Sequence, residues 1–326
     1  MKQEMGNLER NIQRTEPRYA QDTERKLQED ARQYEARNPE VVSWIRDSIS
    51  RIDHERLASA FQRIAGRGGE LNREVGIVSA ERTFVVGGKG IGAHSYIGRT
   101  NALRGDHFKE LMRTRTLQEV AAVLFDAICH ENAHATGSID IQQAERGNVC
   151  ISAGYEDVFI NRETVLTPHH LINEGISELI GELAARIYLE EAPLVLTDVI
   201  SLTAEEYDTY VREELTTGTE LSISGHSLGA REFIYKLAVY VAHKESASTV
   251  DFVERLMKGF FKGGGFISEL GLSLNENLGP NFVADLSSAK TRDDLARIEQ
   301  TYGLPEVTKD FGHQTMSELK RRVQGA

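Results

Sequence analysis

Two histidines and a glutamate lie inside a long apolar segment, in the order His130-Glu131-Asn132-Ala133-His134. On an α-helix, residues four positions apart project from one face, so His130 and His134 can direct imidazole nitrogens to a single point. A core helix tolerates such groups only when they are paired or bind a metal. The segment therefore predicts a buried helix around a metal ion, with Glu131 beside the ion as the base for a bound water.

Both ends of this helix are marked in the sequence. Thr116 and Glu119 form a capping box, and Gly137 is a natural stop after the last turn. Apolar residues occur all round the segment between them, which places the helix inside the molecule. In the alternative, two core histidines bonded to backbone carbonyls, the buried Glu131 would still need a charged partner.

A second apolar helix offers a third ligand. Thr167 would cap it, Pro168 would open it, and its apolar residues continue to Leu189. Glu174 and Glu178 share one face of this helix, where a cation opposite them would offset the unfavourable burial of two carboxylates. We expect Glu174 to bind the metal and Glu178 to accept the outer N–H of a ligand histidine.

The two motifs together resemble the gluzincin metallopeptidases, the group of thermolysin. The segment Asn173-Glu174-Gly175-Ile176-Ser177-Glu178 is similar to the second motif of that family, with Glu in place of its Asp. The gap between the motifs is longer than in thermolysin and is similar to that of anthrax lethal factor. The resemblance implies a zincin fold, one catalytic Zn²⁺ held by His130, His134 and Glu174, and hydrolysis of peptides through a zinc-bound water activated by Glu131.

The resemblance also implies a second donor for the oxyanion, usually a Tyr or a His. Tyr155, His170 and His226 are the candidates. Tyr155 precedes the second helix, His170 lies one turn before Glu174, and His226 belongs to the C-terminal region.

Two other readings compete with this ligand set. The segment from His130 to Asp140 also spells H-E-x-x-H-x-x-G-x-x-D, which resembles a metzincin signature with Asp140 as third ligand, although no Met lies between Met112 and Met257 to form a Met-turn.

A serine hydrolase is the other alternative. The segment Gly225-His226-Ser227-Leu228-Gly229 resembles the nucleophile elbow of α/β-hydrolases, with Asp285 and His313 following in the required order. The consecutive helices expected after residue 230 do not suit that fold.

Composition restricts the remaining function classes. The formal net charge of −12 argues against a nucleic-acid partner, because phosphate contacts need a basic surface. The hydrophilic, charged start leads us to expect no signal peptide, no apolar run is long enough to span a bilayer, and two cysteines are too few for a disulfide framework. We expect a cytoplasmic protein without a membrane partner, although secretion without a cleaved signal peptide would suit the same sequence.

Three regions are expected. Residues 1–66 form a charged helical extension, with an amphipathic helix from Val41 to Ile64, and could bind a partner or inhibit the enzyme. Residues 67–200 form the catalytic core, whose strands include Ala93 to Ile97, with a glycine-rich hairpin over 87–92. Residues 201–326 form a mostly helical C-terminal lobe.

The predicted fold class is α+β: a zincin-like domain with a small mixed sheet and an active-site helix. The predicted function is a zinc peptidase acting on a peptide or protein. A non-enzymatic binding protein that keeps the fold is the competing class.

Overall fold

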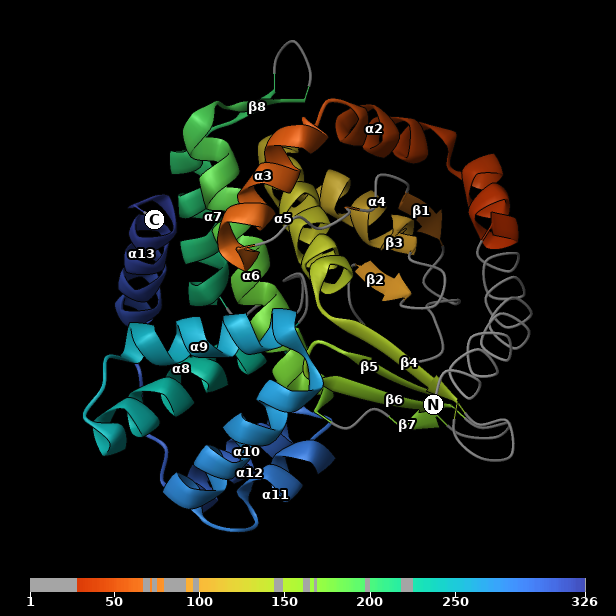
Figure 1. Cartoon of the computed structure of the whole chain (residues 1–326). Coiled ribbons are helices and arrows are strands. Elements are labelled where there is room, and N and C mark those ends of the chain that lie inside the picture. Colours follow the sequence, from red (N-terminus) through yellow and green to blue (C-terminus); the bar gives the residue numbers. More distant parts are fainter. Residues whose placement is uncertain are drawn as a thin grey trace.

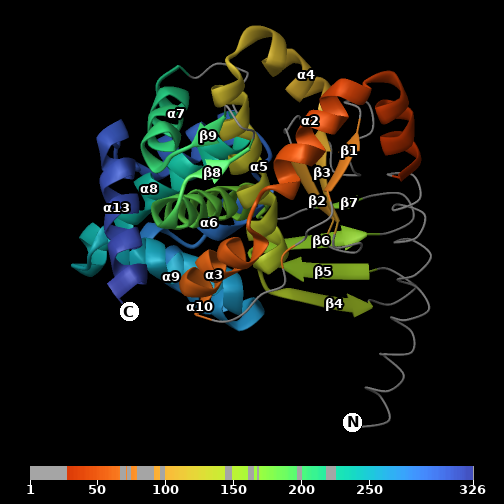
Figure 2. The same cartoon turned by 90° about the horizontal axis from the view of Figure 1, so that it is seen from above.

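Helices dominate the part of the chain described by this computed structural model, namely residues 28–66, 71, 75–78, 92–95, 100–143, 149–160, 165–166, 169–196, 200–217 and 225–325. The described strands are only two to five residues long and fall into three separate sheets (Figures 1 and 2). The prediction of an α+β class with a zincin-like sheet is therefore wrong: the molecule is mostly helical. Its most extensive contacts between elements join helices, namely α5 with α6 and α6 with α8, so the short strands do not define the architecture.

Two long helices form the centre of the molecule. Helix α5 (Leu117–Thr136) begins at the Thr116 capping box, which is confirmed, and ends before Gly137. Helix α6 (His170–Glu191) packs along it. The predicted start of α6 was too early: its N-cap is His169, at a left-handed φ of 62°, so helical geometry begins only at His170. Thr167 and Pro168 lie outside the described residues.

A four-stranded antiparallel sheet connects these two helices. Its strands are adjacent in sequence order: β4 (Ile139–Gln143), β5 (Val149–Ala153), β6 (Glu156–Ile160) and β7 (Val165–Leu166). The turn between β5 and β6 is fixed against the end of α5, since the Gly154 amide donates to the Ser138 carbonyl at 2.8 Å. The sheet extends away from the helices and brings the chain back to the start of α6 (Figure 1).

The N-terminal helices pack onto this centre. Residues 28–37 are helical and are followed by α2 (Pro39–Ser50) and α3 (His54–Ala65), which contacts α6. The single helix predicted from Val41 to Ile64 is wrong, because the Asp53 side chain accepts the amides of Glu55 and Arg56 and starts a new helix there.

A small sheet in the order β1-β3-β2 lies beside α4 (Gly105–Thr114). Its strands are β1 (Val75–Val78), β2 (Gly92–Ser95) and β3 (Thr100–Arg104), and β2 also contacts α5. The predicted hairpin over 87–92 lies outside the described residues, except for Gly92 at the start of β2. Beyond α6, a short β8 (Leu194–Val195) pairs with β9 (Ser201–Leu202).

The C-terminal region is helical as predicted. Its elements are α7 (Ala204–Thr217), α8 (Gly225–Glu245), α9 (Thr249–Lys262), α10 (Gly264–Leu278), α11 (Phe282–Ser288), α12 (Arg292–Tyr302) and α13 (Lys309–Gly325). Helices α10 and α11 were not predicted. Helix α8 packs against α6, so the C-terminal region contributes to the same core. A search of the described helices for a segment with the length and apolarity of a bilayer span found none.

Candidate metal centre

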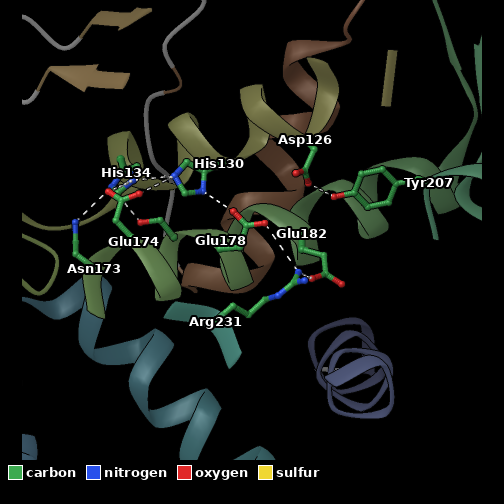
Figure 3. A network of polar contacts seen from close by, with 10 residues as sticks. Asp126, His130, His134, Asn173, Glu174, Glu178, Glu182, Tyr207 and Arg231 are labelled. Carbon is green, nitrogen blue, oxygen red and sulfur yellow. Dashed lines mark hydrogen bonds and ion pairs between the residues drawn. The ribbon is translucent and has the colours of Figure 1, made fainter. Parts of the chain in front are cut away.

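Three side chains from α5 and α6 converge at the centre of the molecule (Figure 3). The Nε2 atoms of His130 and His134 lie 3.1 Å apart. The Glu174 carboxylate faces both: Oε2 is 3.4 Å from Nε2 of His130, and Oε1 is 3.3 Å from Nε2 of His134. The two histidines are four residues apart on α5 and share one face of it, and α6 packs against that face. These two features together produce this triangle of residues.

The three side chains are close enough to share one metal ion. Ligands at about 2.0–2.1 Å from a tetrahedral ion are separated by about 3.3–3.4 Å. The 3.3 and 3.4 Å contacts have this length but reach different oxygens of Glu174, and with one ligand atom from each residue the three atoms lie within 4.8 Å of one another. Two imidazoles and one carboxylate form a donor set that suits Zn²⁺ and leaves one position for water or substrate. The three residues could therefore hold one metal ion, and their donor atoms are of the kinds that Zn²⁺ accepts.

Glu131 lies beside this triangle with an unused oxygen. Its side chain is 5% exposed, and its Oε2 has no hydrogen-bond partner among the described residues. Burial, only partly offset by the neighbouring histidines, raises its pKa to about 7. A buried carboxylate oxygen without a protein partner is unfavourable unless it serves a water or a substrate.

The outer nitrogen of each histidine is also held. Nδ1 of His130 is 2.9 Å from Oε2 of Glu178, and Nδ1 of His134 is 3.1 Å from the Ser177 hydroxyl. The Asn173 amide nitrogen is 3.4 Å from the same Nδ1 of His134, while its oxygen accepts the Tyr155 backbone N–H at 2.9 Å. With Nδ1 engaged in this way, Nε2 of each ring faces the centre of the triangle.

The protein's own charges keep the carboxylates ionised. Burial alone would raise the pKa of Glu174, but the charges of the histidines and their hydrogen bonds hold it well below its usual range. Burial opposes ionisation of Glu178 in the same way, yet the hydrogen bond from His130 and the charges of His130 and Arg231 lower its pKa. Both groups are thus in the anionic form that a dication would attract.

A chain of buried charges continues beyond Glu178. Arg231 of α8 lies against Glu182, and its Nη1 is 3.9 Å from Oε1 of Glu178 (Figure 3). Glu182 also accepts from Arg186 at 2.9 Å, and Arg186 reaches Asp208 of α7 at 2.5 Å. These residues were not predicted from the sequence. The spacing of residues 174, 178, 182 and 186 on an apolar helix was a usable signal for Glu182 and Arg186, whereas nothing local indicated Arg231.

Gly181 allows the two ligand helices to approach closely. A Cβ at this position would lie 2.8 Å from the backbone nitrogen of His130 and 2.9 Å from its Cα. The distance between the histidines and Glu174 therefore depends on the absence of a side chain at Gly181.

The candidate oxyanion donors are placed differently. His170 lies at the edge of the cluster, with Nδ1 3.8 Å from Oε1 of Glu174 and its side chain 31% exposed. The Tyr155 hydroxyl is buried and donates to the Leu256 carbonyl at 2.8 Å, so the structure does not bring it to the cluster. His226 lies in the first turn of α8, and its side chain is outside the described residues.

The rival motifs have less structural support. Asp140 lies in β4 opposite Ser152, with its side chain outside the described residues. Ser227 lies in the first turn of α8, whereas an elbow needs a sharp strand-to-helix turn. Asp285 accepts a hydrogen bond from the Tyr302 hydroxyl at 2.5 Å, and His313 lies in α13.

Comparisons with family models, curated proteins and solved structures gave no match for this chain.

Proposed function

We propose that this protein is a zinc-dependent peptidase whose ion is held by His130, His134 and Glu174. The observation that carries the proposal is the cluster of His130, His134 and Glu174, next to the unpartnered oxygen of Glu131. The two Nε2 atoms lie 3.1 Å apart, and each has a Glu174 oxygen at 3.3 or 3.4 Å. A purely structural metal site needs four protein ligands and no base. Three ligands with a buried carboxylate beside them favour catalysis.

When bound, the ion would supply positive charge that acidifies a water molecule and polarises the substrate carbonyl. Glu131 would accept the proton of that water as it attacks the carbonyl carbon, and would then deliver the proton to the leaving amine as the C–N bond breaks. The free oxygen of Glu131 and its raised pKa suit both roles, because a base with a pKa near the working pH can also return the proton.

His170 is the proposed donor to the oxyanion. It lies one turn before Glu174 on α6, and its side chain is 31% exposed, so a substrate arriving from solvent could reach it. The Tyr155 hydroxyl already donates to Leu256, which makes it the weaker candidate.

The proposed substrate is an extended peptide or a flexible segment of a protein. Strand β2 contacts the metal helix α5, and among the described strands it has a partner on one side only. An extended chain could pair with its other edge.

We further propose a cytoplasmic setting, in line with the buried free thiol of Cys129. We also propose a regulatory or partner-binding role for the N-terminal helices.

The test compares wild type with Glu131→Gln and with Glu276→Gln, an exposed glutamate on α10 that serves as the matched control. Zinc content and cleavage of a peptide library are measured for each. We expect all three proteins to hold one zinc, and only Glu131→Gln to lose cleavage. Wild-type protein that holds zinc and cleaves no peptide would favour a non-enzymatic binding role.

The third ligand is tested separately. Glu174→Ala is expected to release zinc, whereas Asp140→Ala is expected to retain it. The reverse result would transfer the ligand role to Asp140 and support the metzincin-like reading.

A further inference from the structure

We propose that Arg231 is a positioning residue for the metal centre: its guanidinium holds the Glu178 carboxylate in the orientation that directs His130 toward the ion. This inference rests on the proposed metal centre and extends it to α8, a helix that supplies none of the three ligands.

The two oxygens of Glu178 have different partners. Oε2 lies 2.9 Å from Nδ1 of His130, while Oε1 lies 3.9 Å from Nη1 of Arg231 (Figure 3). Rotation of the carboxylate would disturb both contacts together. Arg231 is itself held rigidly, because it is 2% exposed and is hydrogen-bonded to Glu182.

The charges around Glu178 make this support necessary. Glu178 and Glu182 lie one turn apart on α6, and both are almost fully buried. Like charges at this spacing repel each other, and the repulsion is stronger away from water. Arg231 contacts both carboxylates, and the ion-pair partners of Glu178 in the described part of the chain are His130 and Arg231. Without Arg231, repulsion from Glu182 would turn the Glu178 carboxylate and release the ring of His130.

Arg186 provides a matched control. It is also buried and also pairs with Glu182, at 2.9 Å, but its second partner is Asp208 on α7. A substitution there removes a buried arginine from the same chain of charges, one step further from the histidine. Loss of stability alone would therefore affect both arginine variants in the same way.

The experiment measures the zinc affinity of the full-length protein by competition with a chromophoric chelator. Loss of outer-shell partners of metal ligands typically lowers affinity about 10–100-fold, and we expect a decrease of this size for Arg231→Met. Arg231→Lys should give a smaller decrease, because it keeps the positive charge next to Glu178. Some loss should remain, because one ammonium cannot reach both carboxylates as a guanidinium does. Arg186→Met should stay within about twofold of wild type, although urea unfolding should find it destabilised as well.

A double-mutant cycle with Glu178→Gln separates positioning from general destabilisation. If Arg231 acts through Glu178, the Arg231 substitution should change zinc affinity less than about twofold in the Glu178→Gln background. Equal losses in Arg231→Met and Arg186→Met, or an undiminished loss in the Glu178→Gln background, would overturn the inference. If Arg231→Met does not fold by circular dichroism, the same cycle is run with Arg231→Lys. Failure of wild type to bind zinc would instead refute the metal centre itself.

Discussion

Substitution of Gly181 by Ala gives the sharpest test of the metal-centre geometry, because it alters the spacing of two helices without changing any ligand side chain. The new Cβ would lie 2.8 Å from the backbone nitrogen of His130, whereas ordinary contacts begin at 3.4 Å, so α5 and α6 must separate locally by about 0.6 Å. That shift would lengthen the 3.3 and 3.4 Å separations between Glu174 and the histidines to about 3.9–4.0 Å. An ion held by both imidazoles would then lie beyond the usual 2.0–2.2 Å bond to the carboxylate.

We expect Gly181→Ala to weaken zinc binding at least about tenfold, or about 1.4 kcal/mol. Overpacking should also lower the free energy of unfolding by about 1–3 kcal/mol. Zinc affinity is measured by chelator competition and stability by urea unfolding. The control is Gly271→Ala on α10, where the Cβ would meet its nearest atom at 3.8 Å, so affinity should not change. A folded Gly181→Ala protein with wild-type zinc affinity would refute the reasoning.

Three further predictions follow. Glu131 has a folded pKa of about 7, raised above its ordinary value by burial, so the folded protein binds this proton more tightly than the unfolded chain and loses stability as pH rises. Glu131→Gln should therefore raise the unfolding free energy of chelator-treated protein more at pH 8, by up to about 3 kcal/mol, than at pH 5. Equal effects at the two pH values in urea unfolding would contradict this. Zinc at about 100 times its Kd should raise the unfolding free energy of wild type by about 2.7 kcal/mol and leave Glu174→Ala unchanged, as measured by thermal unfolding with and without zinc. Thr116→Ala should lower stability by about 1 kcal/mol through loss of the capping box, with zinc affinity intact; a change in affinity would show that the start of α5 is coupled to the site.

The part of the site that depends on local spacing could be predicted from the sequence. A separation of four residues placed His130 with His134 on one helix face and Glu174 with Glu178 on another. The structure brings these two faces together. The start of α5 was also predictable, because a capping box depends only on neighbouring residues.

Features that depend on tertiary contacts could not be predicted. The contact between Arg231 and Glu178 joins α8 to α6, and no local pattern encodes it. The left-handed conformation of His169, which delays the start of α6, is unusual for a residue other than glycine. The fold class failed for a related reason: short β-like patterns were interpreted as one small mixed sheet of a zincin-like domain, but the described strands form three separate sheets beside a helical centre.

The antiparallel strands between α5 and α6 explain why the two motifs can be far apart in sequence. Each hairpin carries the chain outward and back, so it adds residues without adding net displacement between the helix ends. The turn at Gly154 is tied to Ser138, and the next amide, that of Tyr155, is tied to Asn173, so the inner end of the sheet is fixed at the site. Hairpins could lengthen or shorten at the outer end while the ligand positions stay unchanged. The number of residues between two ligand motifs is therefore a weak criterion for deciding whether they belong to one metal centre.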